Sequence, residues 1–433
     1  MSIPKVPDDV LDSIFDYLDD ASFYNERQPG SSISSAQHTF TILCLVSKRF
    51  LPLARSHLYC RPFPASLHAD GSTASALLSS LVKQRGYLGT MVRSLNGLIS
   101  YVLRLRVESN TSSAIPGIFV WYLSILRACP EVIELDLTFD HPDRLTRVLE
   151  VLQRPNPNLR IVNFANPYGG TRQPIPLTEE LARTALQDPI FRRIEKLSLQ
   201  SLESVELDLE LDPDAVPPSY PPLDLLLRSL SINELYRKYP HPCPISLVNS
   251  SALTHFDLTI SVDSVATLPL YLTPLPSTLE HMTINIVPKE ELSSVSSYNA
   301  RLSDEIRLPL DTFSRFTDLR SLALRHYTGP HLLLLHQIIT SCTQLLRIDL
   351  KGCVWVGDDV ERVAGRKREE YRYAVFPLAD IHKELLSLQS LKRVHLGNVP
   401  AEEQILESLM KIKHSSDFEL EWDVVSDPEL RVV

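Results

Sequence analysis

Leu319-Arg-Ser-Leu-Ala-Leu324 and, 26 residues further on, Leu345-Leu-Arg-Ile-Asp-Leu350 decide the fold. Both stretches follow the frame apolar-x-x-apolar-x-apolar, whose last three positions alternate as side chains do on a half-buried β-strand. The frame recurs along most of the chain. Its other copies are Val132–Leu137, Leu159–Phe164, Ile194–Leu199, Leu227–Ile232, Leu253–Leu258, Leu279–Ile284 and Leu391–Leu396, with Leu103-x-Leu105 as a partial copy.

Several copies are separated by 26 or 27 residues, which is inside the period of roughly 20–29 residues of leucine-rich repeats. Each copy predicts a short parallel strand and a helical or irregular return, because one repeat cannot bury its apolar face without stacking on its neighbours. The stretch Phe418–Trp422 is expected to add a last strand. We expect helical or irregular returns at 144–152, 178–186, 331–341 and 378–388, and insertions at 213–222 and 288–304.

The composition favours such a repeat protein over a nucleotide-binding enzyme. Of the 433 residues 44% are apolar, but only 13 are glycine. The chain contains no G-x-x-x-x-G-K-[ST], G-x-G-x-x-G, G-x-S-x-G or H-E-x-x-H motif, so we expect no cofactor, no metal and no catalytic residues. The net charge of −10 argues against nucleic acid or an anionic membrane as a partner.

The cysteines and the N-terminus predict an intracellular protein of the cytoplasm, the nucleus or both. Six cysteines without a CxxC pair are typical of free thiols in a reducing compartment, and Cys342 and Cys353 are expected to be buried in repeat corners. The acidic first twenty residues lack the basic start and apolar core of a signal peptide. The longest apolar run, 331–339, is far shorter than the ~20 residues that span a bilayer.

The first sixty residues form a separate helical pattern. A polar, serine-rich loop is expected at about 20–38, a second helix at about 40–50, and a short third helix over Leu53–Leu58. Three short helices bury little area, so they are either a cap on the repeats or a module whose apolar stripe binds a partner. The stripe of the first helix consists of Val10, Leu11, Ile14, Phe15 and Leu18.

This segment resembles the F-box, whose pattern is Leu-Pro-x-Glu, two apolar residues and Ile-Phe-x-x-Leu, then Val-Ser/Cys-Lys-x-Trp/Phe, and a helix ending in Leu-Tyr. The matching residues are Pro7, Leu11, Ile14, Phe15, Leu18, Val46, Ser47, Lys48, Phe50, Leu58 and Tyr59. The departures are Val6, Asp9, Phe50 in place of the commoner Trp, and the loop insertion. The resemblance implies that the matching residues bind a Skp-family adaptor and, through it, a cullin. Cys129 and Cys342 stand three residues before two of the frames, which is similar to the cysteine-containing leucine-rich repeats often joined to F-boxes.

The expected fold is an all-α, three-helix F-box in residues 1–63, a helical linker or N-terminal cap in 64–100, and an α/β leucine-rich-repeat solenoid with a curved parallel sheet in 101–433. The resemblance implies the substrate receptor of a Skp/cullin/F-box ubiquitin ligase, which binds a client protein through its repeats and is not itself an enzyme. Two other classes stay open. One is a scaffold that binds proteins without leading to their degradation, and the other is an enzyme with an unrecognised site.

Alternation within each strand places the residues between the apolar anchors on the concave face of the sheet. That face begins acidic, is mostly uncharged in the middle and ends basic. We expect client binding at the basic end, through an acidic or phosphorylated segment of the client. Asp349 lies among these bases, and ordinary solvated surface is the alternative. The basic residues are Arg325, Arg347, Lys351, Arg393 and His395.

Overall fold

The computed structural model describes two compact units, Met1–Ile194 and Glu195–Val433. The residues described lie within 7–15, 35–61, 79–95, 115–164, 177–203, 225–234, 250–287, 313–353 and 378–425, apart from gaps of a few residues inside some of these ranges. Leu18, the partial frame at 103–105 and the insertions predicted at 213–222 and 288–304 lie outside the described residues.

The first unit begins with helices. Residues 9–15 contain a helical segment, followed by α2 (Ser35–Val46) and α3 (Phe50–Cys60). The boundaries differ from the prediction, because α2 begins inside the expected loop and ends at Val46 rather than near Phe50, and α3 is longer at both ends than the predicted Leu53–Leu58. Ser47 ends α2: its carbonyl accepts hydrogen bonds from the N–H groups of Phe50 and Leu51, and its hydroxyl accepts one from the N–H of Arg49.

Three parallel strands follow in the first unit, β1 (Ser94–Leu95), β2 (Glu134–Leu137) and β3 (Ile161–Phe164). Strand β1 lies in the segment predicted to be a linker or cap, and its pairing with β2 makes it part of the sheet. The N–H of Arg93 donates to the carbonyl of Cys60 at 2.9 Å, so the end of α3 is joined to the start of β1.

The helices of this unit include one that the sequence predicted and one that it did not. Helix α7 (Pro142–Leu152) confirms the return predicted at 144–152, whereas α6 (Ile115–Ala128) was not predicted. The return predicted at 178–186 begins instead with a short strand, β4 (Leu177–Thr178). The described residues of this unit also form two 3-10 helices, η1 (Gly89–Met91) and η2 (Pro189–Arg193).

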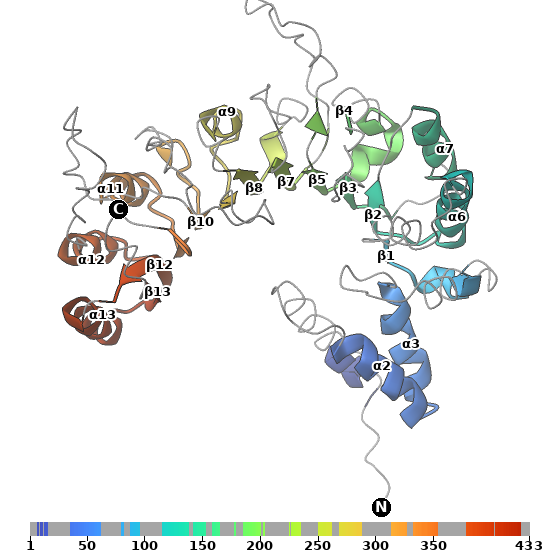
Figure 1. Cartoon of the computed structure of the whole chain (residues 1–433), viewed down its shortest axis with the longest axis horizontal. Helices are drawn as coiled ribbons and strands as arrows, with labels where there is room; N and C mark the ends of the chain where they lie inside the picture. Colours follow the sequence, from blue (N-terminus) through green and yellow to red (C-terminus); the bar gives the residue numbers. More distant parts are fainter. Residues whose placement is uncertain are drawn as a thin grey trace, which may run out of the picture. The chain divides into compact units, whose positions relative to one another are not determined.

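The second unit is a parallel sheet in which every frame copy predicted in this part of the chain forms a strand (Figure 1). The strands pair in sequence order from β5 through β7 to β13. They are β5 (Lys196–Gln200), β7 (Ser229–Glu234), β8 (His255–Ser261), β9 (His281–Val287), β10 (Ser321–Arg325), β11 (Arg347–Asp349), β12 (Arg393–Pro400) and β13 (Glu419–Val425). The short strand β6 (Leu202–Glu203) also belongs to this unit.

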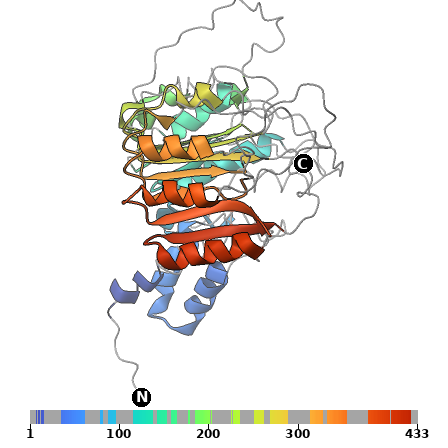
Figure 2. The same cartoon turned by 90° about the vertical axis from the view of Figure 1, so that its left-hand side faces the viewer.

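Helices line one side of these strands, while the other side stays open. Figures 1 and 2 show α11 (Leu332–Ser341), α12 (Leu378–Leu386) and α13 (Glu403–Ser415) along the side of β10 to β13. Helices α11 and α12 confirm the predicted returns, and α13 follows the last predicted frame. The short helix α9 (Leu268–Leu272) and the 3-10 turn η5 (Ser250–Ala252) precede β9 and β8.

The core of the second unit is a set of apolar side chains in register. In the row through the middle of the frame each side chain is at most 1% exposed. Burying one such side chain stabilises the fold by about 1.5–3 kcal/mol, so the row holds the strands in register. Its members are Leu197, Leu230, Phe256, Met282, Leu322, Ile348, Val394 and Leu420.

The cysteines of the repeats lie in the interior. Cys129, Cys342 and Cys353 are buried free thiols. The thiol of Cys353 lies 2.8 Å from the carbonyl oxygen of Leu324, to which it donates. Burial raises the pKa of both Cys129 and Cys342 to about 12, so these thiols stay protonated and serve as small apolar side chains.

Candidate binding surfaces of the N-terminal helices and the sheet

The N-terminal helices share a small core of their own. Phe15 packs edge-on against Phe40, with ring centroids 5.9 Å apart, and also contacts Phe50 and His57. Ala54 completes the buried centre, against which Leu58 is half-buried. The aromatic rings therefore fix how the segment at 9–15 lies on α2 and α3.

This core changes the roles of two predicted adaptor contacts. Leu11 and Phe15 are 8% and 3% exposed, so their side chains face the interior of the helices and not an outside partner. The expectation that they form the adaptor surface needs correction, because the apolar stripe of the first helix is wider than its buried face. Val10 and Ile14, which precede each of them, are the exposed members of the stripe.

Helix α2 presents a second exposed apolar stripe. Ile42, Leu45 and Val46 are spaced as neighbours on one helix face, and Leu45 and Val46 are 84% and 63% exposed. Large apolar side chains grouped in this way on a soluble surface are typical of a protein-binding site. Together with Val10 and Ile14 they are called here the N-terminal apolar stripes.

The remaining residues of the motif are partly exposed. Pro7 and Lys48 lie on the surface, and Tyr59 is half-buried. The carbonyl of Pro7 accepts a hydrogen bond from the N–H of Leu11, so the proline begins the helical segment.

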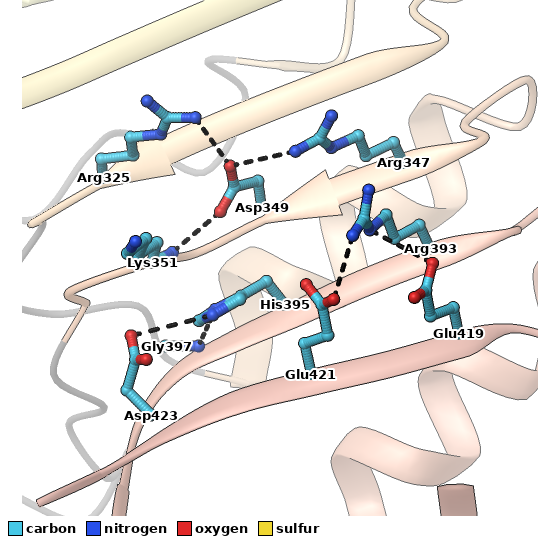
Figure 3. Close-up of polar contacts among 10 residues, drawn as sticks. All are labelled: Arg325, Arg347, Asp349, Lys351, Arg393, His395, Gly397, Glu419, Glu421 and Asp423. Carbon is cyan, nitrogen blue, oxygen red and sulfur yellow. Dashed lines mark hydrogen bonds and ion pairs between the residues drawn. The ribbon is translucent and has the colours of Figure 1, made fainter. Parts of the chain in front are cut away.

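The open face of the second unit is formed by the residues that alternate with the buried anchors. Its basic end lies on β10 to β12, and the structure brings the five predicted basic residues together there (Figure 3). Asp349 on β11 lies between two of them. Its carboxylate accepts a hydrogen bond from Arg325 at 2.9 Å and lies 3.6 Å from the guanidinium of Arg347. The backbone N–H of Lys351 donates to the same carboxylate.

The environment of Asp349 keeps it charged. Burial raises the pKa of this carboxyl, but the hydrogen bond and charge of Arg325, the N–H of Lys351 and the charge of Arg347 together outweigh burial and lower it. With its side chain only 7% exposed, Asp349 is a buried anion that both arginines neutralise.

The last strand supplies further carboxylates. On β13, Glu419 and Glu421 lie 3.3 and 2.9 Å from the guanidinium of Arg393. Asp423 lies 3.7 Å from the ring of His395, whose Nδ1 accepts a hydrogen bond from the N–H of Gly397 (Figure 3). The hydrogen bond from Arg393 lowers the pKa of Glu421, so this pair is charged on both sides.

The basic end is therefore not the free cationic patch that the sequence predicted. Arg325, Arg347, Arg393 and His395 each lie beside a carboxylate, and of these five basic residues Lys351 alone has no ion pair to its ammonium within the described chain. The sequence interpretation missed Glu419, Glu421 and Asp423. The alternation of Phe418–Trp422, which predicted the strand, was the signal that could have placed Glu419 and Glu421 beside Arg393.

The acidic side chains predicted for the strands of the first unit also have hydrogen-bond partners within that unit. Ser94 donates a hydrogen bond to Glu134 at 2.7 Å, and the amide of Asn163 donates one to Asp136 at 3.0 Å. Tyr122 donates to the backbone carbonyl of Asp136, and burial followed by the charge of Asp136 raises the pKa of its hydroxyl. These groups bind one another and so contribute to structure.

The described residues contain no candidate for a metal site or for a membrane-spanning helix. Among them, no group of three or more His, Cys, Asp or Glu side chains is placed to hold a metal ion. In the same part of the chain, no helix combines the length and the apolar character needed to cross a bilayer.

The fold defines the class of the protein as an α/β repeat protein with a parallel sheet. No protein-family model matches the chain, and no curated protein matches it. Among solved structures, the chain is similar to one in the crystal structure of the Rad7 and Elc1 complex in yeast. The sequences are 11% identical, the TM-score is 0.34, and the match covers 92% of this chain and 94% of that chain. A likeness of this degree carries no argument about function.

Proposed function

We propose that the chain is the substrate-recognition subunit of a Skp/cullin/F-box ubiquitin ligase. The N-terminal helices bind the Skp-family adaptor, and the repeats bind the client protein. In this role the chain catalyses no reaction, because it raises the effective concentration of the client near a ubiquitin-charged enzyme.

The observation that carries the proposal is the pair of N-terminal apolar stripes. The helices carry the F-box-like motif and bury their own aromatic core, yet they leave Leu45 and Val46 largely exposed. Covering such side chains stabilises a complex by about 1.5–3 kcal/mol each, which favours a permanent protein partner at this surface.

The test replaces exposed residues, because buried ones would not discriminate. Phe15→Asp places a charge in the core of the helices, so a loss of binding would report unfolding. Leu45→Asp/Val46→Asp changes only the surface and should weaken adaptor binding by at least about a hundredfold. Leu386→Asp is the matched control, because Leu386 is 54% exposed on α12, far along the chain.

Affinity purification of the tagged full chain gives three outcomes. Adaptor and cullin captured together, and lost in Leu45→Asp/Val46→Asp but not in Leu386→Asp, support the ligase subunit. Adaptor captured without cullin would favour the non-degradative scaffold. Failure of the wild-type chain to bind any Skp-family adaptor would overturn the proposal.

A further inference from the structure

Two imidazole rings stack on the open face in the middle of the second unit. The ring centroids of His255 on β8 and His281 on β9 are 4.2 Å apart, and the ring planes meet at 20°. The register places Ser229 of β7 on one side of this pair and Ser321 of β10 on the other. Both neighbours have short side chains and His255 is exposed, so the ring of His255 offers a face to a flat group.

Asp257 lies beside the rings and has no partner of opposite charge among the described residues. It follows His255 by two positions on the same face of β8, which is about 6.6 Å along a strand. Its neighbours in the row are Ser231 and Thr283, which carry no charge. Unlike Asp349 and the acids of β13, it has no cation within the 4.0 Å of an ion pair in the described part of the chain.

The surroundings of the rings disfavour the charged form of His281. Burial lowers the pKa of His281 from its ordinary 6.5, and the charges of His255 and Arg320 lower it further, and together these outweigh the opposite effects of Glu280 and Asp257. Strand β7 faces the rings with Ser229 and Ser231, and Lys196 of β5 lies one strand beyond them in the same row. The surface therefore combines aromatic rings with an uncompensated carboxylate.

We propose that His255, His281 and Asp257 form the site that binds an arginine side chain of the client. This inference rests on the client-binding role of the repeats proposed above. A guanidinium is planar and stacks on aromatic faces, and its fork of N–H donors suits a carboxylate. It lies on the outer face of His255, over the serines of β7, and donates to Asp257.

The charge arrangement of the open face favours a cation here over the acidic segment expected from sequence. An acidic ligand at β10 to β12 has to displace Asp349, Glu419 or Glu421 from arginines that these residues already neutralise. A cation at Asp257 displaces no ion-pair partner among the described residues. The half-buried position of Asp257 also strengthens the pair relative to a fully exposed one.

The experiment uses the full chain and a library of short random peptides displayed on phage. Peptides selected by the wild type should be enriched in arginine, and replacing that arginine by citrulline, which keeps the shape and removes the charge, should weaken capture about tenfold. Asp257→Asn should weaken capture to the same degree. The matched control, Glu419→Gln, removes one carboxylate from the same face and should bind as the wild type does.

A pH series separates stacking from simple charge attraction. Lowering the pH from about 7.5 to about 5.5 favours protonation of the His281 ring, and the new positive charge repels the guanidinium, so capture should fall. In His255→Phe/His281→Phe the rings stay and cannot be protonated. Capture by this variant should be retained at the higher pH and should lose its pH dependence over this range.

The other outcomes overturn the inference. They are enrichment of acidic residues, no enrichment of any residue, or equal capture by wild type and Asp257→Asn. Adaptor capture is measured on the same preparations. Retained adaptor binding without arginine enrichment would reject this site and leave the receptor proposal standing, whereas arginine enrichment without any adaptor binding would reject the receptor proposal alone.

Discussion

Strands β8 and β9 bury the same kind of apolar anchors as strands β11 and β12, but the two pairs of strands differ on the open face. Below both pairs lies the same registered row of buried anchors, with Phe256 and Ile348 at equivalent positions. Above β11 and β12 the charges are many and most are paired within the chain, while above β8 and β9 they are few and Asp257 has no ion pair among the described residues. The number of charges on a face therefore says less about its ligand than whether those charges already have partners.

The largest effect on stability is expected from the buried apolar anchors that both regions contain. Phe256→Ala should lower the free energy of unfolding by about 3–5 kcal/mol and Ile348→Ala by about 2–5 kcal/mol, because each removes a fully buried anchor. Chemical denaturation followed by circular dichroism, with hydrogen exchange to locate the change, measures both. If either substitution had no effect, the alternation of the frame would be displaced by one residue in that region.

The next largest effect on stability should distinguish the carboxylate of Asp349 from that of Asp257. Asp349→Asn should destabilise the second unit by about 1–2 kcal/mol, because it removes a charged acceptor between two partly exposed arginines. Asp257→Asn should change stability by less than about 0.5 kcal/mol, because it removes no pair. Equal effects in the two denaturation midpoints would contradict the distinction between paired and unpaired acids.

Acid should remove the contribution of Asp349 in a predictable direction. The pKa of this carboxyl is lower in the folded chain than its ordinary 3.8, so the folded state binds the proton less readily than the unfolded state does. Its stabilisation is therefore complete above that ordinary value and is lost as the pH falls through the folded pKa. The difference in denaturation midpoint between wild type and Asp349→Asn should shrink over this range, and a constant difference would argue against the paired state.

The smallest effect is expected at Ala323, on β10 between Thr283 and Asp349. The sequence places Ala323 on the open face, and the register confirms that position, but the side chain is only 8% exposed because larger neighbours cover it. Ala323→Ser should change stability by less than about 0.5 kcal/mol, because the added hydroxyl can donate to a neighbouring oxygen. A thermal melt of this variant with a large loss would mean that no space remains beside Asp349.

The sequence predicted the strands well because the frame is repeated and each copy must be buried. All nine complete copies of the frame form parallel strands. The frame does not predict that the chain divides after Ile194 into two compact units. Strand β1 was not predicted, because its frame, Val92-x-x-Leu95, has Gly97 in place of the last apolar anchor.

Side-chain roles were harder to predict than strands. In the first helix, Ile14 and Phe15 are adjacent apolar residues, and only packing against Phe40 decides which of them is buried. On the open face, the sequence pattern of a basic residue does not indicate whether its side chain is free or forms an ion pair. Arg393 meets Glu419 and Glu421 across a separation of more than twenty residues, so its state depends on the register of β12 against β13.

The acids of β13 have a consequence for how copies of this chain behave toward one another. Strand β13 ends the sheet order, so in the described chain its outer edge pairs with no further strand, and such an edge is a template for joining a second copy. Glu419, Glu421 and Asp423 repeat at every second position, and two such edges brought together would set carboxylates opposite carboxylates. Like charges facing each other destabilise strand pairing, so the residues that neutralise Arg393 and His395 within one molecule also disfavour the pairing of two copies through their β13 edges.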